Sequence, residues 1–115
     1  MVRLVLLLLV TSALAQVQTT GNVSLTGSVQ EMTGGKHIVT IAWQASTGQS
    51  ITFRVYRSIT SGADFQMIES QIPGLSFTDL SVNNSTTYYY VVTAYDASTK
   101  TESPYSNQVT AKIPE

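Results

Sequence analysis

The sequence contains no cysteine among its 115 residues. Disulfide bridges, thiolate metal sites and lipid-modified cysteine anchors are therefore excluded. A small domain without these supports must rely on its hydrophobic core, for which a chain of ~100 residues is long enough. Because exported animal domains of this size are usually rich in disulfides, the missing cysteine favours a bacterial source if the chain is exported.

Charged residues are also scarce, at 11% of the chain against ~25% in an average soluble domain. The formal net charge is −1, and the basic residues are scattered along the sequence. Nucleic-acid binding needs lysine and arginine clustered on one face, so no nucleic-acid partner is predicted. Serine, threonine, asparagine and glutamine are abundant together with β-branched residues, a composition that favours strands and turns over helices.

Few residues are suited to catalysis. The single histidine, His37, is predicted to lie exposed at the start of a strand, and no Gly-x-Ser-x-Gly elbow accompanies it. The carboxylates fall mainly in turns, where Asp79 and Asp96 are expected to accept hydrogen bonds from backbone N–H groups. No EF-hand calcium loop and no glycine-rich phosphate loop occurs. We predict no catalytic residue, no metal site and no cofactor, with a small hydrolase as the remotest alternative.

The first residues, MVRLVLLLLVTSALAQ, have the pattern of a secretory signal peptide. Arg3 precedes an unbroken apolar run, and Ala13-Leu14-Ala15 fits the small-x-small rule for cleavage before Gln16. The alternative is a retained membrane anchor, but the apolar segment from Leu4 to Ala15 is shorter than the ~20 residues that span a bilayer. Residues 1–15 are therefore predicted to be a signal peptide, which implies a secreted or periplasmic (cell-envelope) protein without a membrane span after cleavage.

The remainder of the chain alternates apolar and polar residues with a period of two. In HIVTIAWQ (37–44) and ITFRVYRS (51–58) one row of side chains is apolar, which is typical of strands with one buried face. Further short strands are expected around residues 23–32, 65–69, 75–80, 87–95 and 105–113. About seven strands separated by turn signals every ~8–12 residues predict an all-β, immunoglobulin-like antiparallel β-sandwich.

Three runs of residues match the pattern of a known family. Val39, Ile41 and Trp43 form an apolar-x-apolar-x-Trp run, and Phe53 and Val55 form an aromatic-x-Val pair. A third run reads Val82-x-Asn84-Ser85-Thr86-x-Tyr88-x-x-x-Val92-x-Ala94. Over about residues 23–113 the sequence therefore resembles a fibronectin type III domain of the kind found in bacterial secreted proteins, which carries such runs on its second, third and sixth strands. In the sixth, Val82 replaces the leucine of the family and Asn84-Ser85 replaces Pro-Gly.

The resemblance implies two sheets, A-B-E and C′-C-F-G, packed face to face. Trp43 should lie in the middle of the core, and Val92 and Ala94 should point inward. Tyr88 matches the position whose hydroxyl bonds the backbone of the preceding turn. The predicted organisation is a signal peptide (1–15), a flexible lead (16–22) and a fibronectin type III-like domain (23–115).

The outer face of the C-F-G sheet is the one surface that suggests a function. Strand alternation places Arg54, Tyr56, Tyr89, Val91 and Tyr95 there. Aromatic residues stabilise cross-strand pairs by ~0.2–1 kcal/mol, so a purely structural explanation is open. Tyrosine is also enriched in interfaces, so a docking surface is the other explanation.

These observations favour an exported, non-enzymatic interaction or adhesion-type module. It would bind an extracellular or envelope protein, or a glycan, through the C-F-G face or its loops. The alternative is a structural spacer or a self-assembling envelope subunit, whose edge strands pair with another chain.

Overall fold

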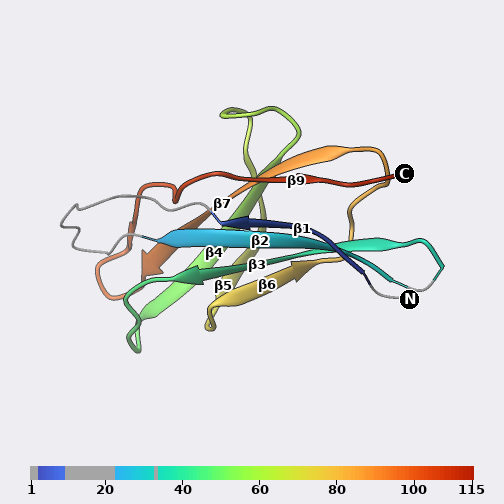
Figure 1. The fold of residues 1–115 in the computed structure, drawn as a ribbon. Coiled ribbons are helices and arrows are strands. Elements are labelled where there is room, and N and C mark those ends of the chain that lie inside the picture. Colours follow the sequence, from blue (N-terminus) through green and yellow to red (C-terminus); the bar gives the residue numbers. More distant parts are fainter. Residues whose placement is uncertain (1–2, 10–22, 33) are drawn as a thin grey trace.

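A computed structural model describes residues 3–9, 23–32 and 34–115, and nine strands lie in these ranges (Figure 1). No helix in the described part of the chain is long and apolar enough to cross a membrane. The strands are β1 (Arg3–Leu9), β2 (Ser24–Glu31), β3 (His37–Gln44), β4 (Ile51–Ser58), β5 (Gln66–Ile72), β6 (Ser76–Asp79), β7 (Thr87–Asp96), β8 (Thr101–Glu102) and β9 (Val109–Lys112).

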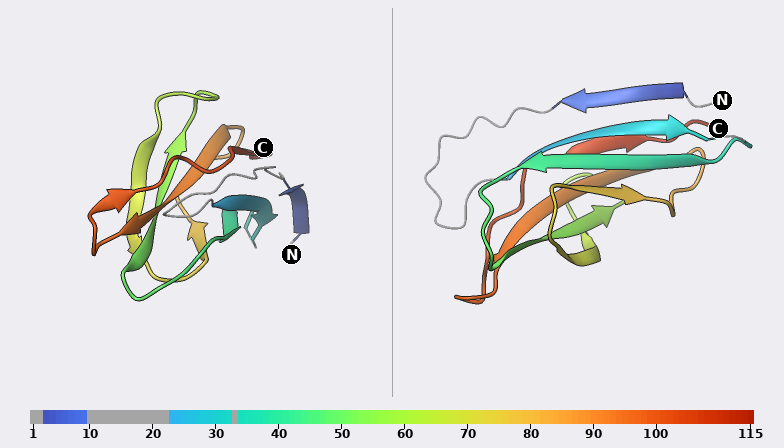
Figure 2. Two further views of the ribbon diagram at one scale, coloured as in Figure 1. Left: turned by 90° about the vertical axis from the view of Figure 1, so that its left-hand side faces the viewer. Right: turned by 90° about the horizontal axis from the view of Figure 1, so that it is seen from below.

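The strands form two antiparallel sheets that lie against each other as layers (Figure 2). One sheet has the order β1-β2-β3-β6; the other has the order β5-β4-β7-β8, with β9 also paired to β7. The predicted all-β sandwich is thus confirmed. The strands that the sequence did not predict are β1 and β8, the latter paired with β7 through Glu102 opposite Tyr95.

Strand β1 lies in the segment that the sequence analysis assigned to the signal peptide. It pairs antiparallel with β2, from Arg3 opposite Glu31 to Leu9 opposite Thr26. The expected cleavage site after Ala15 and the expected flexible lead (16–22) lie outside the described residues. Cleavage before Gln16 therefore stays a prediction, and β1 belongs to the uncleaved chain.

The core lies between the two sheets, where the inward rows of side chains meet. Strand β3 contributes Trp43, whose ring centroid lies 5.5 Å from that of Phe53 on β4. Strand β7 contributes Tyr90, Val92 and Ala94, all fully buried. Because both sheets alternate with a period of two, each supplies one apolar face, and burying these faces stabilises the fold.

Tyr88 ties the start of β7 to the turn before it. Its ring is buried, and its hydroxyl oxygen accepts a hydrogen bond from the backbone N–H of Asn83 at 2.9 Å. The guanidinium carbon of Arg57 lies 4.9 Å from the centre of the ring.

His37 corrects one expectation. The residue is only 2% exposed, and its Nδ1 lies 3.0 Å from Oδ1 of Asn84. It belongs to the inward row of β3, in phase with Val39 and Trp43, so strand alternation extends one residue further than its polar character suggested.

A buried carboxylate connects the two sheets. Asp79, at the end of β6, is 3% exposed; its Oδ2 accepts hydrogen bonds from Tyr90 at 2.6 Å and from Arg57 at 2.8 Å. Its Oδ1 accepts from the backbone N–H of Ser81 at 2.9 Å. Burial by itself would raise the pKa of the Asp79 carboxyl, but the hydrogen bonds from Tyr90, Ser81 and Arg57 hold that pKa below its ordinary value.

Asp96 has the expected role in a turn. Its Oδ1 accepts hydrogen bonds from the backbone N–H of Ser98 at 2.9 Å and from the Ser50 hydroxyl, also at 2.9 Å.

Replacing Trp43 by alanine is expected to lower the free energy of unfolding by about 3–5 kcal/mol, because it leaves a cavity between the sheets. Among the described residues, Trp43 Nε1 is a buried nitrogen without a hydrogen-bond partner. Trp43→Phe therefore loses no hydrogen bond and should cost less. Urea unfolding followed by circular dichroism measures both changes, and equal losses in the two variants would contradict this account.

Stability is expected to fall as the pH drops below about 4, the ordinary pKa of aspartate. The folded state holds the Asp79 carboxylate ionised at pH values where the unfolded chain binds a proton, so its contribution disappears as the pH passes through the lowered pKa. Asp79→Asn should flatten this dependence and cost about 1–3 kcal/mol at neutral pH, since the buried Tyr90 hydroxyl and the partly exposed Arg57 lose the carboxylate.

Tyr90→Phe removes one donor to Asp79 but keeps the ion pair with Arg57, so it should lie between the wild type and Asp79→Asn. Urea unfolding between about pH 2 and pH 7 tests the series. An unchanged pH dependence in Asp79→Asn would exclude this carboxylate as the cause.

Candidate functional site

The outer face of the β4–β7 pair carries four of the five predicted surface residues in partly exposed positions: Arg54, Tyr56, Tyr89 and Tyr95. Val91 differs from the expectation, because it is only 2% exposed. It stands opposite Tyr56, whose ring packs against that of Tyr105. Bulky neighbours therefore cover the middle of the face, and Val91 is unavailable to a partner.

Glu102 joins the side chains at the centre of this face. Its Oε1 accepts a hydrogen bond from Arg54 at 2.8 Å, and its Oε2 accepts from Thr93 at 2.7 Å. The Tyr56 hydroxyl donates to the same Oε2. One carboxylate from β8 thus holds side chains of β4 and β7 in place.

These contacts shift two pKa values in opposite directions. Burial alone would raise the pKa of Glu102, but hydrogen bonds from Thr93 and Tyr56 and the charge of Arg54 bring it below its usual value. The pKa of Tyr56 is raised, first by partial burial and then by its hydrogen bond to the Glu102 carboxylate. Glu102 is therefore ionised and Tyr56 protonated at neutral pH.

Arg54 makes a second contact on this face. Its guanidinium carbon lies 3.9 Å from the ring centre of Tyr95, a cation–π geometry. Since the same guanidinium pairs with Glu102, its charge is neutralised within the face.

Sequence reasoning missed the most exposed aromatic residue here. Tyr105 is 52% exposed; its ring centroid lies 5.2 Å from that of Tyr56 and 5.4 Å from that of Phe65. Met67, 46% exposed, stands opposite Tyr56 on β5. We call Tyr56, Phe65, Met67 and Tyr105 the outer patch.

Two serines place Tyr105 on this face. Ser103 donates its N–H to the carbonyl of Ala94 and accepts from the N–H of Ala94 through its hydroxyl. Ser106 makes the same pair of bonds with Val92. Because hydroxyls replace main-chain acceptors, Pro104 and Tyr105 bulge away from the ladder. The sequence analysis expected a regular last strand from 105 to 113, so it gave no signal for this bulge.

A hollow of about 380 Å³ lies beside the outer patch and is lined by Tyr56, Thr93, Glu102, Ser103, Pro104 and Tyr105. Its lining combines two tyrosine rings with the Glu102 carboxylate and the hydroxyl of Thr93 that donates to it. The arrangement suits contact with another molecule better than chemistry, because the carboxylate is already engaged by three side chains.

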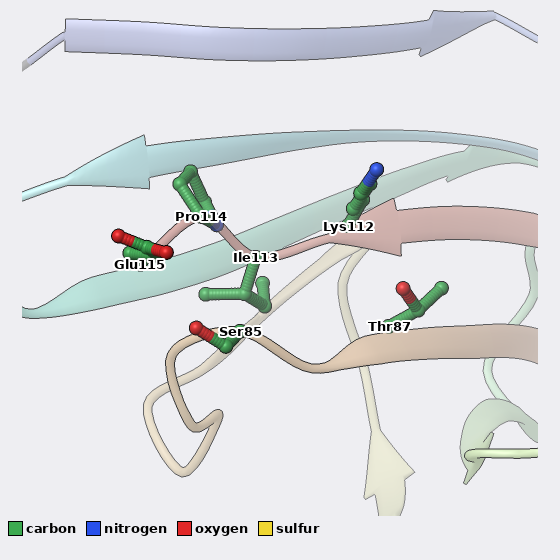
Figure 3. Close-up of a pocket in the computed structure, with 6 residues that line it drawn as sticks. All are labelled: Ser85, Thr87, Lys112, Ile113, Pro114 and Glu115. Carbon is green, nitrogen blue, oxygen red and sulfur yellow. The ribbon is translucent and has the colours of Figure 1, made fainter.

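A second hollow, of about 330 Å³, lies near the end of β9 (Figure 3). Its lining includes Lys112 and Glu115, whose side chains point away from each other, with Ile113 between them. Backbone bonds from Ser85 N–H to Pro114 and from Ile113 N–H to Thr86 close its base. Its two opposite charges are not directed at a common point, so we build no site on it.

No group of three histidine or acidic side chains that could hold a metal ion occurs within residues 3–9, 23–32 and 34–115.

Comparison with known proteins supports the fold. No family model matches the sequence. A protein from Clostridium thermocellum described as Fn3-like superposes with a TM-score of 0.61 and 28% identity, covering 74% of this chain and 84% of that one. The sixth fibronectin type III domain of human fibronectin type III domain containing protein 3 gives a TM-score of 0.53 and 22% identity, covering 67% and 72%. The chain thus resembles fibronectin type III domains in fold.

Among curated proteins, an amylopullulanase of Thermoanaerobacter thermohydrosulfuricus is 32% identical over 77 residues. That match covers 67% of this chain but only 5% of the relative. The chain therefore corresponds to one small module of a much longer enzyme.

Glu102→Gln is expected to lower the pKa of Tyr56 towards its ordinary value, because the negative charge that opposes phenol ionisation is removed. NMR titration of ring-labelled tyrosine measures this shift. The free energy of unfolding should change by only about 1 kcal/mol, since the Arg54–Glu102 pair is partly exposed to solvent and glutamine can still accept hydrogen bonds. An unmoved Tyr56 pKa would show that Glu102 does not hold the phenol.

Proposed function

We propose that this chain is an exported, non-catalytic interaction module that docks another protein of the cell envelope or extracellular space through the outer patch. The observation that carries the proposal is the cluster of the exposed Tyr105 with the partly exposed Phe65 and Tyr56. Glu102 holds Tyr56 in this cluster, and the two flanking serines hold the segment that carries Tyr105. Tyrosine, phenylalanine and methionine are enriched in interfaces, and side chains ordered beforehand bind at a lower entropic cost.

The chemistry of the patch favours a protein surface over a sugar chain. The Tyr56 hydroxyl already donates to Glu102, and the Arg54 guanidinium is turned towards the same carboxylate, so fewer of their hydrogen-bonding groups remain for sugar hydroxyls. The Phe65 side chain offers no hydrogen-bonding group, and Met67 offers only the weak acceptor of its thioether sulfur. A partner with apolar groups and little charge would match this surface.

A glycan is the second candidate, because the similar sequence lies within an amylopullulanase. Aromatic rings on a sheet face can also pack against sugar rings. In this case the module would hold an attached or neighbouring enzyme close to its polysaccharide.

The proposed non-catalytic role is supported by the surroundings of the single histidine, the residue best suited to general-base chemistry. His37 is buried and lies within hydrogen-bond distance of Asn84, which is unsuited to general-base chemistry on an external substrate. Export, in turn, rests on the signal-peptide pattern of residues 1–15, with cleavage before Gln16.

Replacing Tyr56 and Tyr105 together by serine should weaken capture of an envelope partner about tenfold or more, as loss of interface hot spots does. The matched control is Tyr89→Ser, on the same face of β7 but outside the outer patch. It should leave capture unchanged. Pull-down from envelope extract measures protein binding, and affinity electrophoresis in pullulan measures glycan binding.

The outcomes separate the candidates. Pullulan binding that the double variant loses would favour the glycan. Capture that survives in the double variant, or is lost equally in Tyr89→Ser, would contradict docking through the outer patch.

A further inference from the structure

Without residues 1–15, strand β2 would be the edge of its sheet, and it has little protection against pairing. Its residues, SLTGSVQE, pair continuously with β3 from Ser24 to Glu31, and Glu31 is the only charged one. Natural edges are usually blunted by lysine, proline, bulges or short length. By comparison, β5 meets β4 with two register shifts, and β6 has only four residues.

The free hydrogen-bonding groups of this edge can be identified. The N–H and C=O of Leu25 are both bonded to the side-chain amide of Asn107, at 2.9 and 3.0 Å. In an antiparallel strand both groups of one residue point to the same side, and every second residue does the same. Gly27, Val29 and Glu31 therefore direct their N–H and C=O groups away from β3.

In the uncleaved chain these three positions are occupied by a strand. β1 places Leu8 opposite Gly27, Leu6 opposite Val29 and Arg3 opposite Glu31, and it forms the outermost strand of its sheet (Figure 2). The β2 edge thus has the geometry to accept an extended strand, and removal of β1 would make it accessible.

We propose that, once residues 1–15 are removed, the β2 edge pairs antiparallel with the β2 edge of a second copy, with Val29 opposite Val29. The inference rests on the cleavage before Gln16 proposed above. In this register Gly27 lies opposite Glu31 of the other copy, so all three free positions on each chain are used. Leu25 keeps its bonds to Asn107.

A second copy fits this edge for two further reasons. The two-fold register places Gly27, Val29 and Glu31 of both chains on the same face, so the apolar side of β2 stays continuous across the pair. The same register also keeps the two Glu31 carboxylates apart. Like charges directly opposite each other would destabilise the pair.

The absence of native cysteine allows a direct test of the register. Ser28 of one copy would lie opposite Gln30 of the other in a non-hydrogen-bonded pair, with Cα atoms about 4.5 Å apart. That distance lies within the range for a disulfide. Ser28→Cys and Gln30→Cys chains are exported, shown by mass spectrometry to begin at Gln16, mixed in equal amounts and oxidised.

The mixed disulfide should exceed either homodimer about tenfold, because only the 28–30 pair is directly opposed. Gln66→Cys, at the exposed start of β5, replaces Ser28→Cys in the control mixture and should give background cross-linking only. In sedimentation, the cleaved wild-type chain should dimerise with rising concentration. Circular dichroism shows whether the cysteine variants fold. If they do not, sedimentation of the cleaved wild-type chain at rising concentration decides by itself.

A cleaved wild-type chain that stays monomeric at ~1 mM would overturn the proposal. So would cross-linking without preference for the mixed pair, or a chain that is never cleaved and therefore never frees the edge. The double variant Tyr56→Ser, Tyr105→Ser should still dimerise. Loss of partner capture and loss of dimerisation are thus separate results, and each tests one proposal.

Discussion

Packing of the inward row of β7 against the opposite sheet is the contact on which the rest of the structure depends. Tyr88, Tyr90, Val92 and Ala94 are buried one after another along a single strand. In a chain without disulfides, this apolar contact must supply most of the stability. Every side chain on the outer face of β7 takes its position from the same alternation, since placing one row inward places the other outward.

The fold was largely predictable because alternation is a local signal. The rows 37–43 and 88–94 can be read from neighbouring residues, and with them the placement of Trp43 and Tyr88. The prediction that His37 is exposed was wrong, although the sequence contained the signal for its burial. It lies in phase with Val39 and Trp43, and a buried position followed from the period alone.

The candidate site was less predictable because its contacts are between residues distant in sequence. Tyr56 meets Glu102 and Tyr105, and Phe65 meets Tyr105, over separations that no pattern in a single strand records. Val91 points outward as alternation requires, yet neighbouring rings cover it. Direction along a strand therefore predicts which face a residue belongs to, but not whether solvent reaches it.

In the bulge held by Ser103 and Ser106, different residues pair with β7 and face the solvent. The serine hydroxyls and main chain maintain registry with β7, while Pro104 and Tyr105 between them contribute nothing to the ladder. Residues at these two positions can therefore change during evolution without disturbing strand pairing. A lineage of such domains could acquire new partners by altering two side chains, while the sandwich that presents them stays the same.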